Sequence, residues 1–385
     1  MTMGPGDAVW ERFGHNAIWI RDRELGTDVV YNWGMFDFNQ PNFLGRFLTG
    51  DTKYWMAGFD LASTVEVYPA GNRAVWAQEL ALTPAQRVEL RDFVEWNARP
   101  ENMYYRYDYY RDNCSTRVRD AIDGVIGGRI RTTTAPRMTA TTYRSHTQRL
   151  TAGDFPVYTG IMLALGHPAD RPISEWQEMF LPMRMREHLR TVRVPDESGR
   201  LVPLVRAETQ LVSASRGPEP DAPPRLVPFY LAVSLGIAAV IVVLTRLAEK
   251  GSGAPRLALA LVVAAWSLVA GLLGTAALLA WTVTQHVFMY RNENLLQFNP
   301  LPLALALVFP VLLYRGWGAR ATRLVSVTVA TLAVVGLLMK VIPVFDQRNW
   351  EIIALALPAH VAVALSVRRT VVRRVAAASA ERAAA

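Results

Sequence analysis

Hydrophobic residues divide the chain into two parts. From residue 226 onwards, apolar segments alternate with short charged loops, whereas residues 1 to about 222 mix polar, apolar and aromatic positions. The five apolar segments cover residues 226–246, 257–284, 300–315, 324–345 and 351–367. Each approaches or exceeds the roughly 17–25 residues that a helix needs to cross a bilayer. We therefore expect an all-α transmembrane domain of five helices over residues 226–367.

The charged loops between these segments indicate how the helices are oriented. Basic residues gather around the first and third loops and in the tail, at Arg246, Lys250, Arg256, Arg315, Arg320, Arg323, Arg368, Arg369, Arg373 and Arg374. Basic loops normally stay in the cytoplasm. This predicts a multi-pass membrane protein, with a basic cytoplasmic tail over residues 368–385 and residues 1–212 on the outer face. The net charge of +8 then reflects membrane topology, and we expect no nucleic-acid partner.

The two parts are joined by residues 213–225, SASRGPEPDAPPR, whose proline-rich polar composition is typical of a linker. A domain that is exported ahead of the first apolar segment needs a signal sequence or an N-terminal helix. The opening residues MTMGPGDAVW have the composition of neither. We therefore expect an export segment upstream of residue 1.

The first part has the patterns of a mixed domain of strands and helices. Alternation over residues 13–20 and 29–34 predicts a β-hairpin, which would set Asn32 or a neighbour across from His15. Further strands are expected over 63–70 and 74–82, and a short or irregular helix within 35–50. Thr83-Pro84 predicts the start of a helix through Asn97, with Val88, Phe93, Val94 and Trp96 as its apolar members. Weaker helical patterns follow over 157–165 and 174–190.

A single cysteine, Cys114, stands directly before another helical pattern. Asn113 or Asp112 is suited to cap that helix, because a short polar side chain accepts hydrogen bonds from the first turn. Cys114 would then lie in the first turn, where the helix dipole and nearby Arg117 favour a thiolate. These features predict a nucleophile. The alternative is a buried cysteine that acts as a small hydrophobe.

A nucleophilic cysteine needs a base, and the chain has six histidines. His167 stands between Gly166 and Pro168 and is expected in a turn, while His146 and His188 lie in arginine-rich stretches that suggest solvated faces. His15 instead lies on a predicted strand, which would hold its imidazole in a fixed direction. The residues alone leave two roles open for His15, a catalytic base or a structural histidine.

Several motifs in this order resemble the Lnb N-terminal periplasmic domain family. They are ERFGHNAIWI, YNWGMFDFNQPNF and YRYDYYRDNCSTRVRDAI, followed by GIMLALGHPADRPISEWQEMFLP and HVFMYRNENLLQFNPL. The resemblance implies an α+β domain similar in plan to permuted papain-like (NlpC/P60-related) thiol enzymes, with the histidine strand before the cysteine helix. It implies His15 as base and Cys114 as nucleophile. It also implies lipoprotein N-acylation, in which an acyl chain moves from a phospholipid to the α-amino group of a lipidated cysteine.

The remaining site residues are predicted from the chemistry that this reaction needs. Asn32 is nominated to orient His15, with Tyr109 or Asp112 as rivals. Tyr109, Asp112 and Arg117 are expected to contact substrate close to Cys114. In the loop over 285–299, His286, Asn292 and Asn294 would hold a phosphate or position the domain on the bilayer. The alternative is that these are ordinary interfacial residues.

Two other functions fit the same residues. One is a membrane-tethered cysteine peptidase or amidase acting on cell-wall peptides, in which water resolves the acyl-enzyme. The other is a non-catalytic membrane scaffold or sensor. Five membrane helices favour a lipid substrate, because a peptidase needs only one anchor. One cysteine and scattered histidines lack the spacing of a zinc site, so we expect neither metal nor cofactor.

Overall fold

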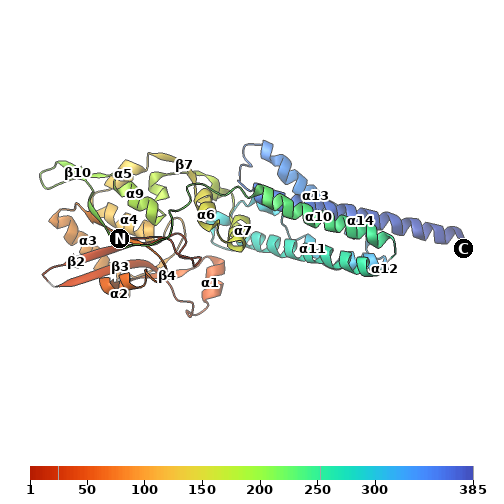
Figure 1. Ribbon diagram of the computed structural model, residues 1–385, viewed down its shortest axis with the longest axis horizontal. Coiled ribbons are helices and arrows are strands. Elements are labelled where there is room, and N and C mark those ends of the chain that lie inside the picture. The colour runs from red at the N-terminus through yellow and green to blue at the C-terminus, as the bar shows by residue number, and fades with distance from the viewer. Residues whose placement is uncertain (25, 252, 385) are drawn as a thin grey trace. The chain divides into compact units, whose positions relative to one another are not determined.

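The protein forms two compact units in the computed structural model, which describes residues 1–24, 26–251 and 253–384. Unit 1 contains Met1–Tyr158 and Arg171–Pro223, and unit 2 contains Thr159–Asp170 and Pro224–Ala385. Each unit therefore consists of two separate stretches of chain. Figure 1 shows the strands in the first unit and the long helices in the second.

A seven-stranded antiparallel sheet organises unit 1. Its strands lie in the order β11-β5-β1-β2-β3-β4-β6. Their bounds are β1 (Thr2–Met3), β2 (His15–Asp22), β3 (Thr27–Met35), β4 (Lys53–Asp60), β5 (Val75–Leu80), β6 (Tyr104–Arg106) and β11 (Val205–Val212). The predicted hairpin is confirmed, because β2 pairs with β3 in a register that sets Ala17 opposite Asn32. Two small sheets pair β7 (Met138–Thr142) with β8 (Pro172–Ser174) and β9 (Arg193–Pro195) with β10 (Leu201–Pro203).

Helices surround the sheet and close the core. They are α1 (Phe43–Thr49), α2 (Leu61–Glu66), α3 (Pro84–Asn97), α4 (Cys114–Val125), α5 (Arg129–Thr134), α6 (Tyr143–Thr151), α8 (Glu175–Glu178) and α9 (Pro182–Leu189). Helix α7 (Phe155–Ala164) begins in unit 1 and ends in unit 2, where a 3₁₀ turn, His167–Asp170, follows it. Val94 of α3 and Val118 of α4 pack with Ile18 and Trp33 of the sheet in the main apolar core. This packing fixes α4 against the two strands of the hairpin.

One local prediction in this unit was wrong. Residues 63–70 were expected to form a strand, but α2 occupies the first four of them and a turn follows, because the Asp60 side chain accepts from the Ser63 N–H and caps a helix there. Helix α3 begins where Thr83 and Pro84 predict it. Leu90 and Val94 form its buried apolar face, whereas Val88, Phe93 and Trp96 are exposed.

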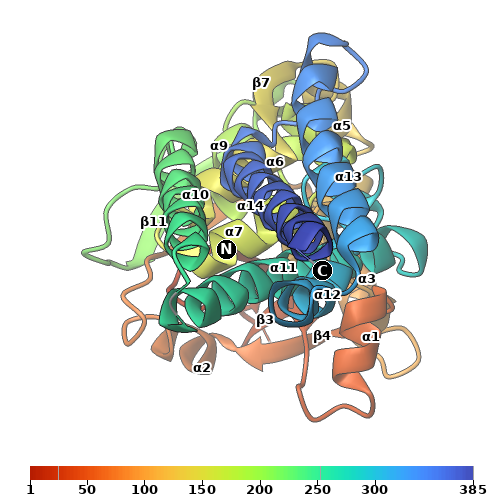
Figure 2. The same ribbon diagram turned by 90° about the vertical axis from the view of Figure 1, so that its right-hand side faces the viewer.

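Unit 2 is a bundle of long apolar helices. These are α10 (Val227–Glu249), α11 (Gly253–Thr282), α12 (Pro302–Arg315), α13 (Ala319–Leu338) and α14 (Trp350–Ala384). In Figure 2, α14 lies between α10 and α13. Among the described residues, four helical segments are long and apolar enough to cross a membrane: 227–249, 253–282, 319–341 and 350–377. The remaining predicted span, residues 300–315, corresponds to α12. Its 14 residues fall short of the usual length of a membrane-spanning helix, so the count of five helices stays a prediction.

The chain before α12 explains how a short helix is accommodated. Asn299 packs directly on Gly274 of α11, where a Cβ atom would lie 2.3 Å from the Asn299 nitrogen. Gln297 donates to the Ala333 carbonyl of α13 at 3.0 Å, and its own carbonyl accepts from His360 of α14 at 2.9 Å. Irregular backbone at membrane depth is tolerated where protein surrounds it. This stretch therefore extends α12 within the bundle.

The C-terminal ends of α10 and α12 lie beside the basic part of α14 at one end of unit 2. Arg373 of α14 donates to the Glu249 carbonyl at the end of α10. Arg374 donates to the Leu313 carbonyl in the last turn of α12 at 2.5 Å. The basic residues of the first loop, the third loop and the tail therefore gather at the same end of the bundle.

Candidate active site

Cys114 is the first residue of α4, and Asn113 caps the helix. The Asn113 Oδ1 atom accepts from the N–H groups of Ser115 and Thr116, both at 2.9 Å. The Thr116 hydroxyl accepts in return from the Asn113 N–H at 2.8 Å, which completes a capping box. The predicted helix start is confirmed, with Asn113 and not Asp112 as the cap. The thiol is partly exposed at the positive end of the helix dipole.

His15 lies at the start of β2 and is oriented by Asn32 on β3. The His15 Nε2 atom lies 3.0 Å from Asn32 Oδ1. Because a carbonyl oxygen only accepts, this bond puts the proton on Nε2 and leaves Nδ1 able to take another. Asn32 is buried and donates its own amide to the Val30 carbonyl at 3.0 Å, which fixes Oδ1 toward the imidazole.

The two predicted reactive groups interact and shift each other's titration. Burial raises the pKa of the Cys114 thiol, but the charge of His15 and the hydrogen bond to it, with backbone N–H groups of Asn16 and Ser115, outweigh burial and lower that pKa. Burial alone lowers the pKa of His15, but the Cys114 charge and hydrogen bonds to Cys114 and Asn32 outweigh it and raise that pKa. Both shifts favour a thiolate beside an imidazolium.

The residues that follow His15 and Cys114 join strand β2 to helix α4. The side-chain amide of Asn16 lies 2.9 Å from Ser115 Oγ, and both residues are buried. Ser115 Oγ also donates to the Met179 carbonyl at 2.7 Å. Neither Asn16 nor Ser115 was predicted as a site residue. The only feature of the sequence that could have indicated them is their position directly after the two predicted reactive residues.

Gly34 of β3 lies against the nucleophile. Its φ of +91° is a conformation that favours glycine. A Cβ atom at this position would lie 3.5 Å from Cys114 Cβ and 3.9 Å from the Tyr105 hydroxyl oxygen. Gly34 therefore leaves open space between the thiol and the ring of Tyr105 on β6. This role was also not predicted, although a glycine inside a strand often marks a close approach.

The Tyr105 hydroxyl is buried beside this space and has no hydrogen-bond partner among the residues that the structure describes. Burial, and then the charge of Cys114, raise the pKa of Tyr105 well above its ordinary value, so the hydroxyl keeps its proton. A buried hydroxyl without a partner is rare in folded proteins. Here it is a donor available close to the thiol.

Residues 1–149, which carry His15, Asn32 and Cys114, match the family described as the Lnb N-terminal periplasmic domain. This stretch belongs to that family. No curated protein and no solved structure matches the chain. The Lnb domain and the four apolar helical segments together fit a membrane-bound enzyme of lipoprotein processing.

Three further predicted residues of the Lnb domain lie beside α4. Asp112 and Arg117 form a bidentate ion pair, and the Arg117 guanidinium lies over the Tyr105 ring, 4.2 Å from its centre. Both charged residues line a cavity of about 490 Å³ between α3 and α4. The Tyr109 carbonyl accepts from the Asn113 amide at 3.0 Å. Arg117 therefore supports the Tyr105 ring, and contact of these residues with substrate stays a prediction.

The predicted residues of the loop over 285–299 belong to unit 2 and lie outside the Lnb domain. Asn292 donates to the carbonyls of Leu163 and Ala164 at 2.9 and 3.0 Å, and Asn294 donates to those of Met162 and Leu163. These carbonyls are at the end of α7, where a helix lacks internal donors. Asn292 and Asn294 are thus helix-capping residues here. His286 immediately precedes the 3₁₀ turn Val287–Met289, and a substrate contact for all three stays a prediction.

His146 and His188 were expected on solvated faces, and this prediction was wrong. His146 is only 1% exposed and lies 2.9 Å from Glu178 Oε1, while His188 Nε2 lies 2.7 Å from Glu178 Oε2. The arginine-rich sequence suggested a solvated face, but Arg149 points into the domain. Its Nε donates to His146 Nδ1 at 3.0 Å. The two histidines therefore bind one buried carboxylate and are not available to Cys114.

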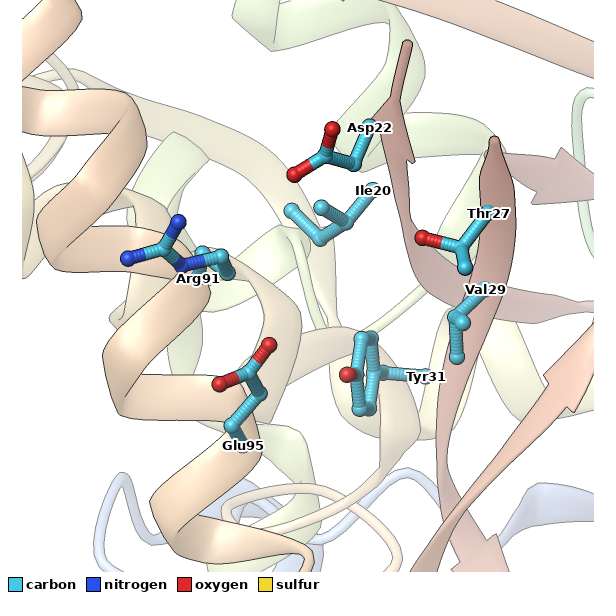
Figure 3. Close-up of a pocket in the computed structure, with 7 residues that line it drawn as sticks. All are labelled: Ile20, Asp22, Thr27, Val29, Tyr31, Arg91 and Glu95. Carbon is cyan, nitrogen blue, oxygen red and sulfur yellow. The ribbon is translucent and has the colours of Figure 1, made fainter. Parts of the chain in front are cut away.

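A second cavity of the domain lies away from the thiol. It has a volume of about 200 Å³ and lies between the tip of the β2–β3 hairpin and α3. Figure 3 shows Asp22, Arg91, Glu95 and Tyr31 among the side chains around it. None of its lining residues belongs to the Cys114 site, and we assign it no part in the chemistry.

Proposed function

We propose that the protein transfers an acyl chain from a phospholipid to the α-amino group of a diacylglyceryl-cysteine lipoprotein, through a thioester on Cys114. The observation that carries the proposal is the pairing of a thiol at a helix N-terminus with an imidazole oriented by Asn32. This arrangement activates a cysteine for attack on a carbonyl carbon. The order of the histidine strand before the cysteine helix supports the permuted papain-like plan.

In the first half-reaction, the Cys114 thiolate attacks the ester carbonyl of the phospholipid and forms a tetrahedral oxyanion. The ester C–O bond then breaks, the acyl group stays on sulfur as a thioester, and the leaving alcohol of the lysophospholipid takes a proton from His15. The backbone N–H groups directed at the sulfur and the unpartnered hydroxyl of Tyr105 are the donors that we assign to the oxyanion.

In the second half-reaction, the α-amino group of the lipoprotein attacks the thioester carbonyl. His15 accepts the proton that the amine loses, an amide bond forms, and Cys114 leaves as the thiolate that began the cycle. No cofactor is needed for either step, because acyl transfer between an ester, a thiol and an amine involves no net oxidation.

We place the Lnb domain on the periplasmic face of the inner membrane and the C-terminus in the cytoplasm. The support is the gathering of the basic ends of α10, α12 and α14 at one end of unit 2, since basic ends normally face the cytoplasm. If α10, α12 and α14 all run toward the same side of the membrane, then α12 and the buried chain before it must together cross the bilayer. We therefore retain five membrane crossings in the proposal.

Intact mass spectrometry tests the proposed first half-reaction. The purified full chain is incubated with a defined phospholipid beside Cys114→Ala, His15→Ala and, as a surface control, Thr132→Ala. We expect the unmodified chain and the Thr132→Ala control to carry an acyl adduct, and hydroxylamine to remove this adduct. We expect no adduct on Cys114→Ala or His15→Ala. If Cys114 reacts with alkylating agents but never carries an acyl group from lipid, the proposal is wrong and cell-wall peptides become the substrates to try.

A further inference from the structure

An aromatic patch lies at the end of the sheet where α1 connects β3 to β4. We define it by Trp10, Phe36, Phe38, Phe43, Leu44 and Leu48. The rings contact each other, with centroids 5.8 Å apart for Trp10 and Phe38, 5.1 Å for Phe36 and Phe38, and 5.2 Å for Phe38 and Phe43. Figure 1 shows α1 at the opposite end of the sheet from the tip of the β2–β3 hairpin.

The patch exposes far more apolar surface than single surface residues usually do. Trp10, Phe38, Leu44 and Leu48 are between 59% and 67% exposed, and α1 has no buried residue. Leaving side chains of this size in water forgoes the free energy that their burial would release. Contiguous exposed patches of this kind mark sites of interaction.

The charges around the patch fit an interface with lipid better than a protein partner. Helix α1 has no acidic residue in its first turn, and its single arginine, Arg46, lies 3.4 Å from Asp51 and is paired within the domain. Asp37, between Phe36 and Phe38, is exposed, and its carboxylate accepts from the backbone and side-chain N–H groups of Asn39. Lys53, the next cation, lies over the Tyr104 ring at 3.9 Å. Aromatic rings with few free charges are typical of the interface between headgroups and acyl chains. The chain also carries four segments able to span a bilayer, so a bilayer is always close by.

A continuous row of aromatic rings leads from the patch to the thiol. Phe36 contacts Tyr54 at 5.3 Å between ring centroids, and Tyr54 stacks on Tyr107 at 4.4 Å. The Tyr107 ring in turn lies beside Gly34, which borders Cys114. These ring contacts therefore connect the patch to the residue that borders the nucleophile.

We propose that the aromatic patch inserts into the outer leaflet of the membrane and delivers the phospholipid acyl ester to Cys114. The proposal rests on the proposed acyl transfer for its purpose, but insertion itself needs no chemistry. An amphipathic helix at such an interface reaches about 5–10 Å into the boundary between headgroups and acyl chains. The rings then lower the cost of drawing an acyl ester out of the bilayer.

Depth-dependent fluorescence quenching tests the insertion. Cys114 is the only cysteine, so Cys114→Ala gives a background in which Leu48→Cys or Phe38→Cys carries a single dye. The matched control is Val88→Cys, an exposed aliphatic residue of α3 near the other end of the sheet. Each labelled full chain is reconstituted in phosphatidylglycerol–phosphatidylethanolamine vesicles with nitroxide-labelled lipids. Two patch positions guard against a label that disturbs folding.

We expect a loss of fluorescence at Leu48 and Phe38, greater for a nitroxide near the headgroup than for one at the bilayer centre, and no loss at Val88. A patch dye that stays in water would overturn the proposal. So would a dye that is shielded equally in detergent and vesicles without lipid quenching, which would mean that other residues of the chain cover the patch. Equal quenching at Val88 would show that insertion is not specific. Since these chains lack the nucleophile, none of these results depends on thioester formation.

Discussion

The side chain of Asn16 lies 2.9 Å from Ser115 Oγ and so hydrogen-bonds the strand that presents His15 to the helix that presents Cys114. Each of these two residues directly follows a predicted reactive residue. Their contact holds the backbone of β2 at a fixed distance from the backbone of α4, and this sets the distance between base and nucleophile. The reactive side chains themselves remain partly exposed.

Removing this contact is expected to slow acylation more than it destabilises the fold. Ser115→Ala loses the hydrogen bonds to Asn16 and Met179, which are worth about 1 kcal/mol each. The shift of α4 relative to β2 should lower the rate of adduct formation on Cys114 by roughly tenfold or more, because small misplacements in an active site are costly. Time-resolved mass spectrometry measures this rate, and Thr132→Ala should acylate normally. An unchanged rate would show that Asn16 and Ser115 do not position the pair.

The pH dependence of Cys114 alkylation should report the coupled shifts. Because the pKa of Cys114 is lowered and that of His15 is raised, the thiolate persists at pH values where an ordinary cysteine is protonated. The midpoint of iodoacetamide labelling should therefore lie below the usual cysteine pKa of about 8.5.

His15→Ala removes both the charge and the hydrogen bond of the imidazole, so burial then dominates and the midpoint should move to higher pH. Asn32→Ala should produce a smaller shift in the same direction, since the imidazole remains but is less well oriented. Labelling of the unmodified chain with the profile of free cysteine would contradict a paired thiolate.

Tyr105→Phe tests the assignment of an oxyanion donor. The substitution removes one buried hydroxyl that has no partner in the described chain, so the free energy of unfolding should stay the same or rise slightly. Acylation should slow by roughly 10²-fold, which is typical for the loss of one oxyanion donor. Tyr104→Phe removes an exposed hydroxyl on the same strand and serves as the matched control. Normal acylation by Tyr105→Phe would remove this residue from the mechanism.

The local features of this fold could be predicted from the sequence because they depend on neighbouring residues. The hairpin of His15 and Asn32 follows from alternation, and the start of α4 follows from Asn113 before a helical pattern. The role of Gly34 depends on a residue 80 positions away, Cys114, and no local signal carries such a contact. Burial of His146 was missed for the same reason, since its partner Glu178 lies on another element.

Glu178 should make the stability of the protein depend on acid. Burial raises its pKa, but hydrogen bonds from His146 and His188 outweigh burial and hold that pKa far below its ordinary 4.5. Burial also lowers the pKa of His146 from 6.5. In both cases the unfolded chain binds protons first as the pH falls. The apparent melting temperature should therefore decrease below about pH 6.5 and decrease further below 4.5.

Glu178→Gln removes the carboxylate that the two histidines share. We expect a loss of about 3 kcal/mol near neutral pH, as for one partner of a buried ionic network, and a weaker dependence on pH below 4.5. Glu197→Gln, an exposed residue, is the control for charge alone. Thermal unfolding in detergent at several pH values measures both effects. A Glu178→Gln variant that is as stable as the unmodified chain would show that the network is not a structural element.

The chain passes between its two units three times, after Tyr158, after Asp170 and after Pro223. Residues 159–170 therefore leave the first unit, bind the second through the amides of Asn292, Asn294 and Gln347, and return. A chain truncated at the linker would leave the carbonyl groups of these residues without the side-chain amides that donate hydrogen bonds to them. The residues around Cys114 are thus interleaved along the chain with unit 2, and cleavage of the linker alone would leave residues 159–170 bound within unit 2.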